Sequence, residues 1–199
     1  MHAVTNDQIL ALPDLADLAA RIVAAGPVAL QLRSRSLPAA PLAQLARELR
    51  WPSDFLFVND RVDLVPHLGA AGVHLPSRGL SVADARGLLG ANAMIGRSTH
   101  SPTEARAAWD DGADYVFLGP IWDTPSHPGR PALGPTAIEH AAPARVVAIG
   151  GVTAARVERC RDAGAWGVAA ISALWTASDP NAVAARMLLC LTGSTDRPD

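Results

Sequence analysis

Three observations predict that this sequence folds as an α/β protein, a single (β/α)8 TIM barrel. Along the 199-residue chain, short apolar runs rich in β-branched residues alternate with alanine-rich stretches of helical period. Eight such runs occur, and each is followed by a helical stretch or a loop, which favours a closed barrel. The segment after the first run, Val4–Asp7, contains no glycine, whereas an open doubly wound sheet usually has a glycine-rich turn there.

The expected strands are short and mostly apolar, as is typical of strands that are buried on both faces. In chain order they are His2–Thr5, Val28–Leu32, Phe55–Val58, Gly72–Leu75, Met94–Gly96, Tyr115–Leu118, Val146–Ile149 and Gly167–Ile171. Glycines such as Gly69, Gly112 and Gly164 shortly precede a strand, where they can end the preceding helix in a left-handed conformation.

The expected helices are amphipathic, and several follow a residue that can cap a helix. Ser81, Ser101 and Thr153 each stand directly before a helical stretch, where a hydroxyl oxygen can accept a hydrogen bond from a free backbone amide. The helical ranges are Leu15–Ala25, Leu42–Leu49, Val82–Leu88, Thr103–Asp111, Ala154–Ala163 and Asn181–Leu191. We therefore expect residues 1–192 to form the barrel and residues 193–199 to form a frayed tail.

The composition excludes several classes of function. With 49% hydrophobic and 18% charged residues and a net charge of −2, the chain has no basic surface for nucleic acid. It has neither a signal peptide nor an apolar stretch of roughly 20 residues, so we expect a cytoplasmic protein without a membrane partner. Two cysteines, Cys160 and Cys190, are expected to be reduced thiols. All 17 basic residues are arginine, so no lysine can form a Schiff base.

Polar residues cluster at the carboxyl ends of the expected strands, where barrels of this class place their active sites. Gln31 and Arg33 share one face of their strand and can donate hydrogen bonds to an oxyanion, although an interior salt bridge would also explain them. Asn59 and Asp60 follow the next strand, and Asp60 suits either Mg²⁺ or pairing with an arginine. Ser98 follows the expected fifth strand, just past its carboxyl end.

A phosphate site is predicted after the last two strands. Loops at these positions commonly bind phosphate through backbone amides and a helix amino terminus. Gly150 and Gly151 follow the seventh strand, and Ile171 and Ser172 follow the eighth. The glycines would let the backbone approach the phosphate, and the serine adds a hydroxyl. The alternative is a tight turn with no ligand.

Three histidines are candidates for proton transfer. His127 lies in a long polar loop after the sixth strand that can act as a lid, and it is our candidate catalytic residue. An exposed and inert His127 remains an equal alternative. His74 and His100 lie at strand ends, and for both a structural role remains open.

These groups, in this order, resemble the thiamine phosphate synthase/TenI family over almost the whole chain. The matching segments are Gln31–Arg33, Val58–Asp63, Gly72–Leu75, Ile95–Ser101, Ala113–Val116, Leu118–Ile121, Thr124–Pro125 and Ala148–Gly151. The resemblance implies one of two reactions. The synthase joins a pyrimidine pyrophosphate to thiazole phosphate and expels pyrophosphate with Mg²⁺, whereas TenI-like members aromatise a thiazole carboxylate phosphate tautomer by proton transfer.

The chain departs from both family patterns. The synthase pattern has a lysine at Arg35, a metal-binding aspartate at Gly79, beside Arg78, and a lysine at His127. The TenI pattern has a proton-transferring histidine at Pro120. The substrate contacts that the residues and the resemblance imply are Gln31, Arg33, Arg35, Asn59, Ser98, His100, Thr124, Ser126, Gly150, Gly151, Ile171 and Ser172.

The leading hypothesis from the sequence is a TenI-like tautomerase that needs no cofactor. A divergent synthase is the alternative, in which Mg²⁺ binds Asp60 while Arg35 and Arg78 hold the pyrophosphate. A catalytically silent barrel that binds thiazole phosphate is the third. The expected partner is a phosphorylated small molecule, and the sequence leaves open whether the chain forms a homodimer.

Overall fold

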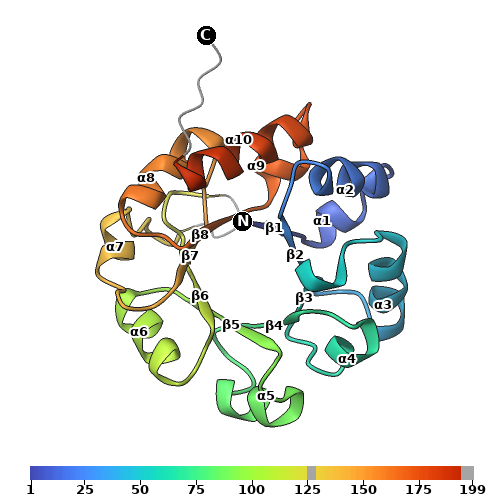
Figure 1. Ribbon diagram of the computed structural model, residues 1–199, viewed down its shortest axis with the longest axis horizontal. Helices are drawn as coiled ribbons and strands as arrows, with labels where there is room; N and C mark the ends of the chain where they lie inside the picture. The colour runs from blue at the N-terminus through green and yellow to red at the C-terminus, as the bar shows by residue number, and fades with distance from the viewer. Residues whose placement is uncertain (125–128, 194–199) are drawn as a thin grey trace.

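The computed structural model describes residues 1–124 and 129–193 and confirms the (β/α)8 barrel. All the strands are parallel and pair in chain order, and β1 closes the barrel by pairing with both β2 and β8. Figure 1 looks along the barrel axis and shows the strands as an inner ring inside the helices. The strands are β1 (His2–Val4), β2 (Ala29–Leu32), β3 (Leu56–Asn59), β4 (Gly72–Leu75), β5 (Met94–Thr99), β6 (Tyr115–Leu118), β7 (Val146–Ala148) and β8 (Gly167–Ala170).

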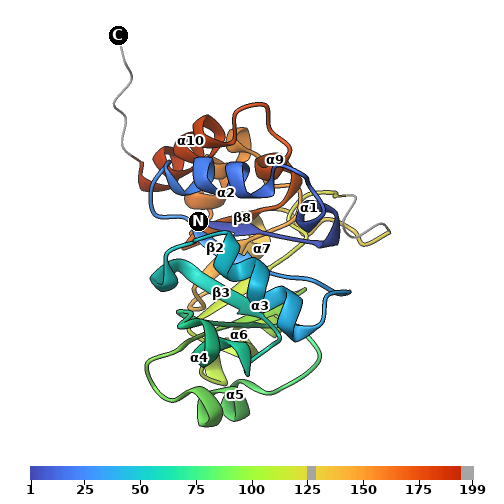
Figure 2. The same ribbon diagram turned by 90° about the vertical axis from the view of Figure 1, so that its right-hand side faces the viewer.

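The helices lie outside the strands, as the side view shows for α2, α3 and α10 (Figure 2). Within the described residues, no helix has both the length and the apolarity needed to cross a bilayer. The helices are α1 (Asp7–Leu10), α2 (Leu15–Val23), α3 (Ala39–Glu48), α4 (Leu64–Leu68), α5 (Val82–Leu89), α6 (Pro102–Asp110), α7 (Thr136–Glu139), α8 (Val157–Asp162), α9 (Ser172–Trp175) and α10 (Pro180–Thr192), with 3₁₀ turns at Ser53–Phe55 and Ala154–Arg156.

The helix starts confirm two of the three predicted caps. The Ser81 hydroxyl oxygen accepts from the Asp84 amide at 3.0 Å, and that of Ser101 accepts from the Glu104 amide at 3.1 Å. The prediction for Thr153 is wrong, because its side chain makes no cap bond and a 3₁₀ turn follows it. Both cysteines are free thiols, as expected.

Some elements differ from the predicted ranges. β5 continues to Thr99 rather than ending at Gly96, because Arg97, Ser98 and Thr99 stay paired with β6. Ser98 therefore lies inside a strand and not after it. The helices α1, α4, α7 and α9 were not predicted, since four or five residues are too few to show a helical period.

Alternation along the strands divides the buried residues into two cores. Residues that point outward, such as Leu30, Val58 and Leu118, belong to a large aliphatic cluster between the strands and the helices, which we call the outer core. Residues that point inward form a smaller cluster rich in aromatic rings, which we call the inner core. Its members include Val4, Ala29, Phe57, Tyr115, Phe117, Val147 and Ala169.

Candidate active site at the mouth of the barrel

The carboxyl ends of the strands form the mouth of the barrel, and polar side chains replace the inner core there. Gln31 has 2% of its surface exposed, and its Nε2 donates to Asn59 Oδ1 at 2.8 Å. Its Oε1 is buried and has no hydrogen-bond partner among the described residues. An unsatisfied buried acceptor is costly, so this oxygen is suited to receive an N–H group of a ligand.

His74 lies in the middle of this layer and is fully buried. Its Nε2 is 2.9 Å from Ser98 Oγ, and its Nδ1 is 3.3 Å from the Tyr115 hydroxyl. Burial, with smaller contributions from the positive charges of Arg33 and Arg97, lowers the pKa of His74 to about 3. The imidazole is therefore neutral near pH 7 and is unsuited to exchange protons there.

A cationic region lies beside this layer, after β2. The guanidinium groups of Arg33 and Arg35 form no ion pair with the carboxylates of the described residues, so the interior salt bridge considered for Arg33 does not form. Burial, and then the nearby charge of Arg35, lower the pKa of Arg33. A bound anion would relieve this repulsion between the two groups.

Asp7, which the sequence analysis missed, fixes the loop that carries these arginines. Its carboxylate accepts from the hydroxyls of Ser34 and Ser36 at 2.5 and 3.0 Å and from the Arg35 amide at 3.1 Å. The hydrogen bond from Ser34 is the main cause that lowers the pKa of Asp7. The signal was present in the sequence, since Asp7 follows the first strand at the same end of the barrel.

The structure brings Asp60 and Gly79 together, as the resemblance implied. A Cβ built on Gly79 would lie 3.6 Å from Asp60 Oδ1, so a carboxylate at residue 79 would face that of Asp60. With glycine there, no group of three or more His, Cys, Asp or Glu side chains that could hold a metal occurs in the described parts of the chain. Arg61 pairs with Asp63 and not with Asp60. The residues present do not form the two-carboxylate Mg²⁺ site.

The turn after β7 packs tightly against the loop after β6. Gly150 and Gly151 have φ angles of +91° and +64°. A Cβ on Gly150 would lie 2.6 Å from Pro120 Cα, and one on Gly151 would lie 2.8 Å from Asp123 O. The glycines are therefore required by this contact, a reason that differs from the predicted approach of a phosphate.

The backbone amides of this turn are nevertheless free to bind an anion. Gly150, Gly151 and Ser172 donate to no backbone acceptor within the described chain. Because β7 pairs with β8, the turn lies beside Ile171 and Ser172, which begin α9. The predicted phosphate site thus has the donors it needs, and its occupancy stays a prediction.

The remaining predicted residues lie near the loop after β6. His100 Nδ1 donates to the Gly119 carbonyl oxygen at 2.9 Å, which holds its ring at the edge of the mouth. Thr124 is the last described residue before the break at 125–128. Ser126 and His127 lie outside the described residues, so the proposed catalytic role of His127 stays a prediction.

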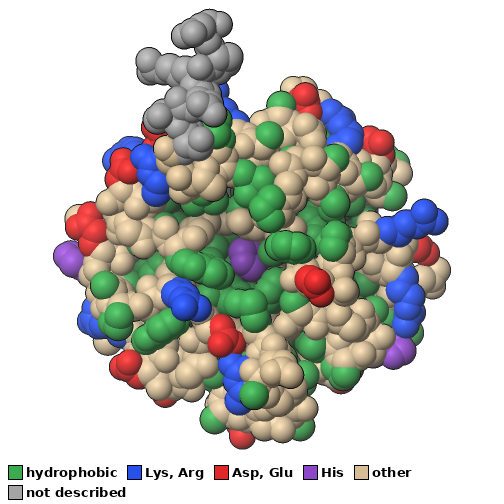
Figure 3. Space-filling view, in the orientation of Figure 1, with side chains coloured by type: hydrophobic (Ala, Val, Ile, Leu, Met, Phe, Trp, Pro, Cys, Tyr) green, Lys and Arg blue, Asp and Glu red, His purple; other side chains and the backbone are tan. Residues whose placement is uncertain are grey.

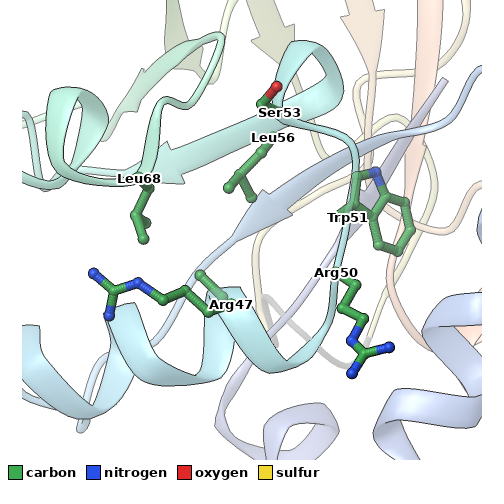
Figure 4. A pocket seen from close by; sticks show the side chains of 7 residues that line it. Arg47, Arg50, Trp51, Ser53, Leu56 and Leu68 are labelled. Carbon is green, nitrogen blue, oxygen red and sulfur yellow. The ribbon is translucent and has the colours of Figure 1, made fainter.

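The opposite, amino-terminal end of the barrel has a different character. Figure 3 shows hydrophobic side chains gathered around the centre of this face. A shallow cavity of about 230 Å³ lies near the start of β3, lined by Ala46, Arg47, Arg50, Trp51, Ser53, Leu56 and Leu68. In Figure 4 the guanidinium of Arg50 points away from Leu56. This cavity does not combine converging polar groups as the mouth does.

The chain resembles known proteins over most of its length. The model of the family described as "Thiamine monophosphate synthase" matches residues 1–174. A thiamine-phosphate synthase of Thermus thermophilus is 37% identical over 177 residues, which cover 84% of each chain. A solved structure of thiamine phosphate pyrophosphorylase from Pyrococcus furiosus has a TM-score of 0.78 and 26% identity, covering 96% of this chain and 95% of that one. A structure of 3-hexulose-6-phosphate synthase, with a TM-score of 0.69 and 18% identity, shares the fold.

Some relatives are longer than this chain. It covers 54% of the thiamine-phosphate synthase of Gloeobacter violaceus, with 37% identity over 183 residues. It covers 38% of a thiamine biosynthesis bifunctional protein ThiM/ThiE of Symbiobacterium thermophilum, with 42% identity over 181 residues. The match of the family model over residues 1–174 confirms the resemblance found in the sequence. The chain belongs to the thiamine monophosphate synthase family, a family of thiamine-biosynthesis enzymes.

Proposed function

We propose that this chain is a divergent thiamine-phosphate synthase, which joins a pyrimidine pyrophosphate to thiazole phosphate and releases pyrophosphate. This reverses the order of the two hypotheses that the sequence suggested. The observation that carries the proposal is that the guanidinium groups of Arg33 and Arg35, at the mouth, form no ion pair with any carboxylate of the described residues. Relatives named thiamine-phosphate synthase, at 37% identity, support it.

The mouth offers separate regions for the two phosphorylated substrates. Arg33 and Arg35 follow β2 and suit the pyrophosphate, which carries the higher negative charge. The amides of Gly150, Gly151 and Ser172 follow β7 and β8 and suit the single phosphate of the thiazole. Gln31 and Asn59 lie in the neutral layer at the end of β2 and β3, where the Gln31 acceptor can orient the pyrimidine.

The chemical step then depends on charge neutralisation. The bond between the pyrimidine substrate's carbon and the pyrophosphate oxygen breaks, and its electron pair leaves with the pyrophosphate, while the thiazole forms the new bond to that carbon. Preorganised guanidinium groups stabilise the charge that develops on the leaving oxygen. Arg78 lies next to Gly79 and can add a third positive charge from the loop after β4.

This site offers Mg²⁺ fewer carboxylate ligands than the family pattern does. Asp60 supplies one carboxylate, and Gly79 lacks the side chain that would supply the second. The protein groups therefore do not form a metal site, and we assign the neutralisation of the leaving group to arginines.

The tautomerase hypothesis has less support in the described residues. It requires a group that exchanges protons near neutral pH within reach of the ligand. The pKa of His74, about 3, is too low for this role. His100 Nδ1 is occupied by the Gly119 carbonyl, and residue 120 is proline. The bond to Gly119 engages only one of the two ring nitrogens of His100, so His100 and His127 remain the candidates, and their test is separate.

The two reactions are distinguished by one assay with four arms. The protein is incubated with pyrimidine pyrophosphate and thiazole phosphate, or with the thiazole tautomer, each with Mg²⁺ or with a chelator. We expect thiamine phosphate to form in the first pair of arms. Turnover of the tautomer without condensation would overturn the proposal, and the variant His127→Asn would then test proton transfer.

Variants of the arginines test the residue assignment. Arg33→Met and Arg35→Met should each lower kcat/KM for the pyrimidine pyrophosphate by roughly 10²-fold, because each removes a charge-assisted contact with the leaving group. Arg21→Met is the matched control, since Arg21 pairs with Asp179 on the surface. Equal effects of all three changes would contradict the assignment.

A further inference from the structure

We infer that Tyr115 and His74 are positioning residues that fix Ser98 as a hydrogen-bond donor toward the ligand. Three side chains form a chain through the barrel interior: the Tyr115 hydroxyl, the His74 imidazole and the Ser98 hydroxyl. The identity of the ligand rests on the proposed function, but the direction of the hydrogen bonds does not. None of the three residues is used for this purpose in the reaction described above.

The inner core contains the space that this chain of hydrogen bonds needs. Tyr115 lies on β6 and is fully buried, and its ring packs against the rings of His74 and Phe117 at centroid distances of 5.6 and 5.7 Å. The phenol lies directly over Gly96 on β5, since a Cβ there would be 2.2 Å from Tyr115 Cζ. Gly96 thus leaves the space through which the hydroxyl reaches His74 Nδ1.

The direction of the first hydrogen bond follows from burial. The Tyr115 hydroxyl stays protonated, because burial raises its pKa above the ordinary value near 10. His74 Nδ1 is its sole hydrogen-bond partner in the described parts of the chain. If Nδ1 carried the imidazole proton, the buried phenol hydrogen would have no acceptor, which is unfavourable. The phenol therefore donates, and Nδ1 accepts.

The direction of the second bond follows from the first. The neutral imidazole has one N–H group, which must then be at Nε2. Nε2 donates to Ser98 Oγ over 2.9 Å. With one lone pair occupied, Ser98 directs its own hydrogen elsewhere, and its position near the end of β5 places that hydrogen at the mouth.

The consequence is a preference for ligands that present an acceptor to Ser98. Arg33 and Arg97 are the charged groups whose fields reach His74, and both are cationic. Their fields and the Ser98 donor favour the same kind of ligand atom, an oxygen of a phosphate or pyrophosphate group. An N–H group of a ligand would find its acceptor at Gln31 Oε1 instead.

Nitrogen NMR of the imidazole tests the direction without any assay of activity. In ¹⁵N-labelled protein, with the His74 signals assigned from a His74→Asn variant, we expect the Nε2–H tautomer. Tyr115→Phe removes the phenol donor and should raise the Nδ1–H population. The inference is overturned if the wild-type protein holds the Nδ1–H tautomer, or if Tyr115→Phe leaves the tautomer unchanged.

A matched control separates this role from packing. Thr99→Val removes another buried hydroxyl of β5, one that donates to the Phe117 carbonyl oxygen at 2.8 Å and takes no part in the chain. We expect Thr99→Val to keep the Nε2–H tautomer. A tautomer change of the same size in both variants would show a general effect of lost hydroxyls and would overturn the inference.

A double-mutant cycle tests the link to Ser98, with affinity for inorganic pyrophosphate measured by calorimetry. Tyr115→Phe should weaken binding about 5-fold to 10-fold in the wild-type background and have no effect after Ser98→Ala. Equal effects in both backgrounds would overturn the link. A protein that shows the expected tautomer and cycle but no condensation would refute the proposed function and leave this inference intact.

Discussion

The outer and inner cores of this barrel are built from alternate residues of the same strands, yet they differ in composition. The outer core is aliphatic, and its members pack between strands and helices. The inner core contains aromatic rings, and toward the mouth it is followed by a layer of polar side chains that includes Gln31, His74 and Ser98. The difference indicates that a strand divides its tasks by face: one face stabilises the fold, and the other holds the groups that we propose meet the ligand.

The neighbours Leu118 and Phe117 on β6 give the sharpest test of this division. Leu118 is fully buried in the outer core, so Leu118→Ala should lower the free energy of unfolding by about 3 kcal/mol, the usual cost of such a cavity. We expect the kcat/KM of the folded protein to stay within about 2-fold. Urea unfolding and steady-state kinetics measure the two effects.

Phe117 provides the opposite case, because its ring lies 4.0 Å from the His74 ring, measured between centroids. Phe117→Leu is closer in volume and should cost less than about 2 kcal/mol of stability. It should lower kcat/KM more than Leu118→Ala does. If the two substitutions changed stability and kinetics in the same proportion, the division of tasks between the two faces would be wrong.

The buried imidazole of His74, next to the inner core, should make the free energy of unfolding depend on pH. The pKa of His74 is about 3 in the folded protein and near 6.5 when unfolded, so the unfolded state binds more protons between these values. Stability is then intact above about pH 6.5 and falls as the pH decreases, by about 1.4 kcal/mol per pH unit at most. This amounts to roughly 2.5 kcal/mol between pH 6.5 and 4.5.

Urea unfolding at several pH values measures this loss. In His74→Asn the loss of stability between pH 6.5 and 4.5 should be smaller by this roughly 2.5 kcal/mol, since the contribution of the imidazole is removed. His2 is also buried with a lowered pKa, so some pH dependence is expected to remain in the variant. An unchanged slope would show that His74 is not the source.

A carboxylate added at the mouth of the barrel tests whether the ligand that binds there can be changed without changing either core. Gly79→Asp should place a second carboxylate beside Asp60 and raise the affinity for Mg²⁺ by about 10-fold, or about 1.4 kcal/mol. Because φ at Gly79 is +144°, some backbone strain is expected. Gly90→Asp is the control, with φ of +80° and open space around it. A similar gain in both variants would exclude a specific site.

The smallest expected effect concerns the helices that cover the outer core. Ser81→Ala removes the cap of α5 and should cost about 1 kcal/mol. Thr153→Ala should cost much less, since the Thr153 side chain makes no cap bond. Neither change should alter kcat/KM. Thermal unfolding of the two variants measures the difference, and equal losses would contradict the cap assignment.

The sequence was sufficient for the fold because hydrophobic alternation and helical period are local signals. The eight strands and the longer helices follow from them, whereas α1 and α9, at four residues each, lack enough length to show a period. At the site, the alternation predicted that Gln31 and Arg33 share a face; Gln31 lies in β2, and Arg33 follows one residue after the strand ends at Leu32. The position of Asp7 after the first strand was a signal that it belongs to the mouth, but its bonds to Ser34 and Ser36 could not be predicted, because they join residues that are far apart in the chain. The link between Tyr115 and His74 depends on space above Gly96, which no local pattern reports.

The close contact between the turn after β7 and the loop after β6 limits how this protein can diverge in evolution. Trp122 donates its backbone amide to the Gly150 carbonyl oxygen at 3.0 Å, and Gly150 and Gly151 leave no room for side chains. Arg156 then lies over the Trp122 ring, at 5.1 Å from its centroid, and donates to the Gly151 carbonyl oxygen at 2.6 Å. A substitution at any of these four residues (Trp122, Gly150, Gly151 and Arg156) therefore requires a compensating substitution at another. The turn after β7 and the segment Pro120–Asp123 must therefore change together, so a new specificity is more readily acquired at parts of the mouth outside this contact.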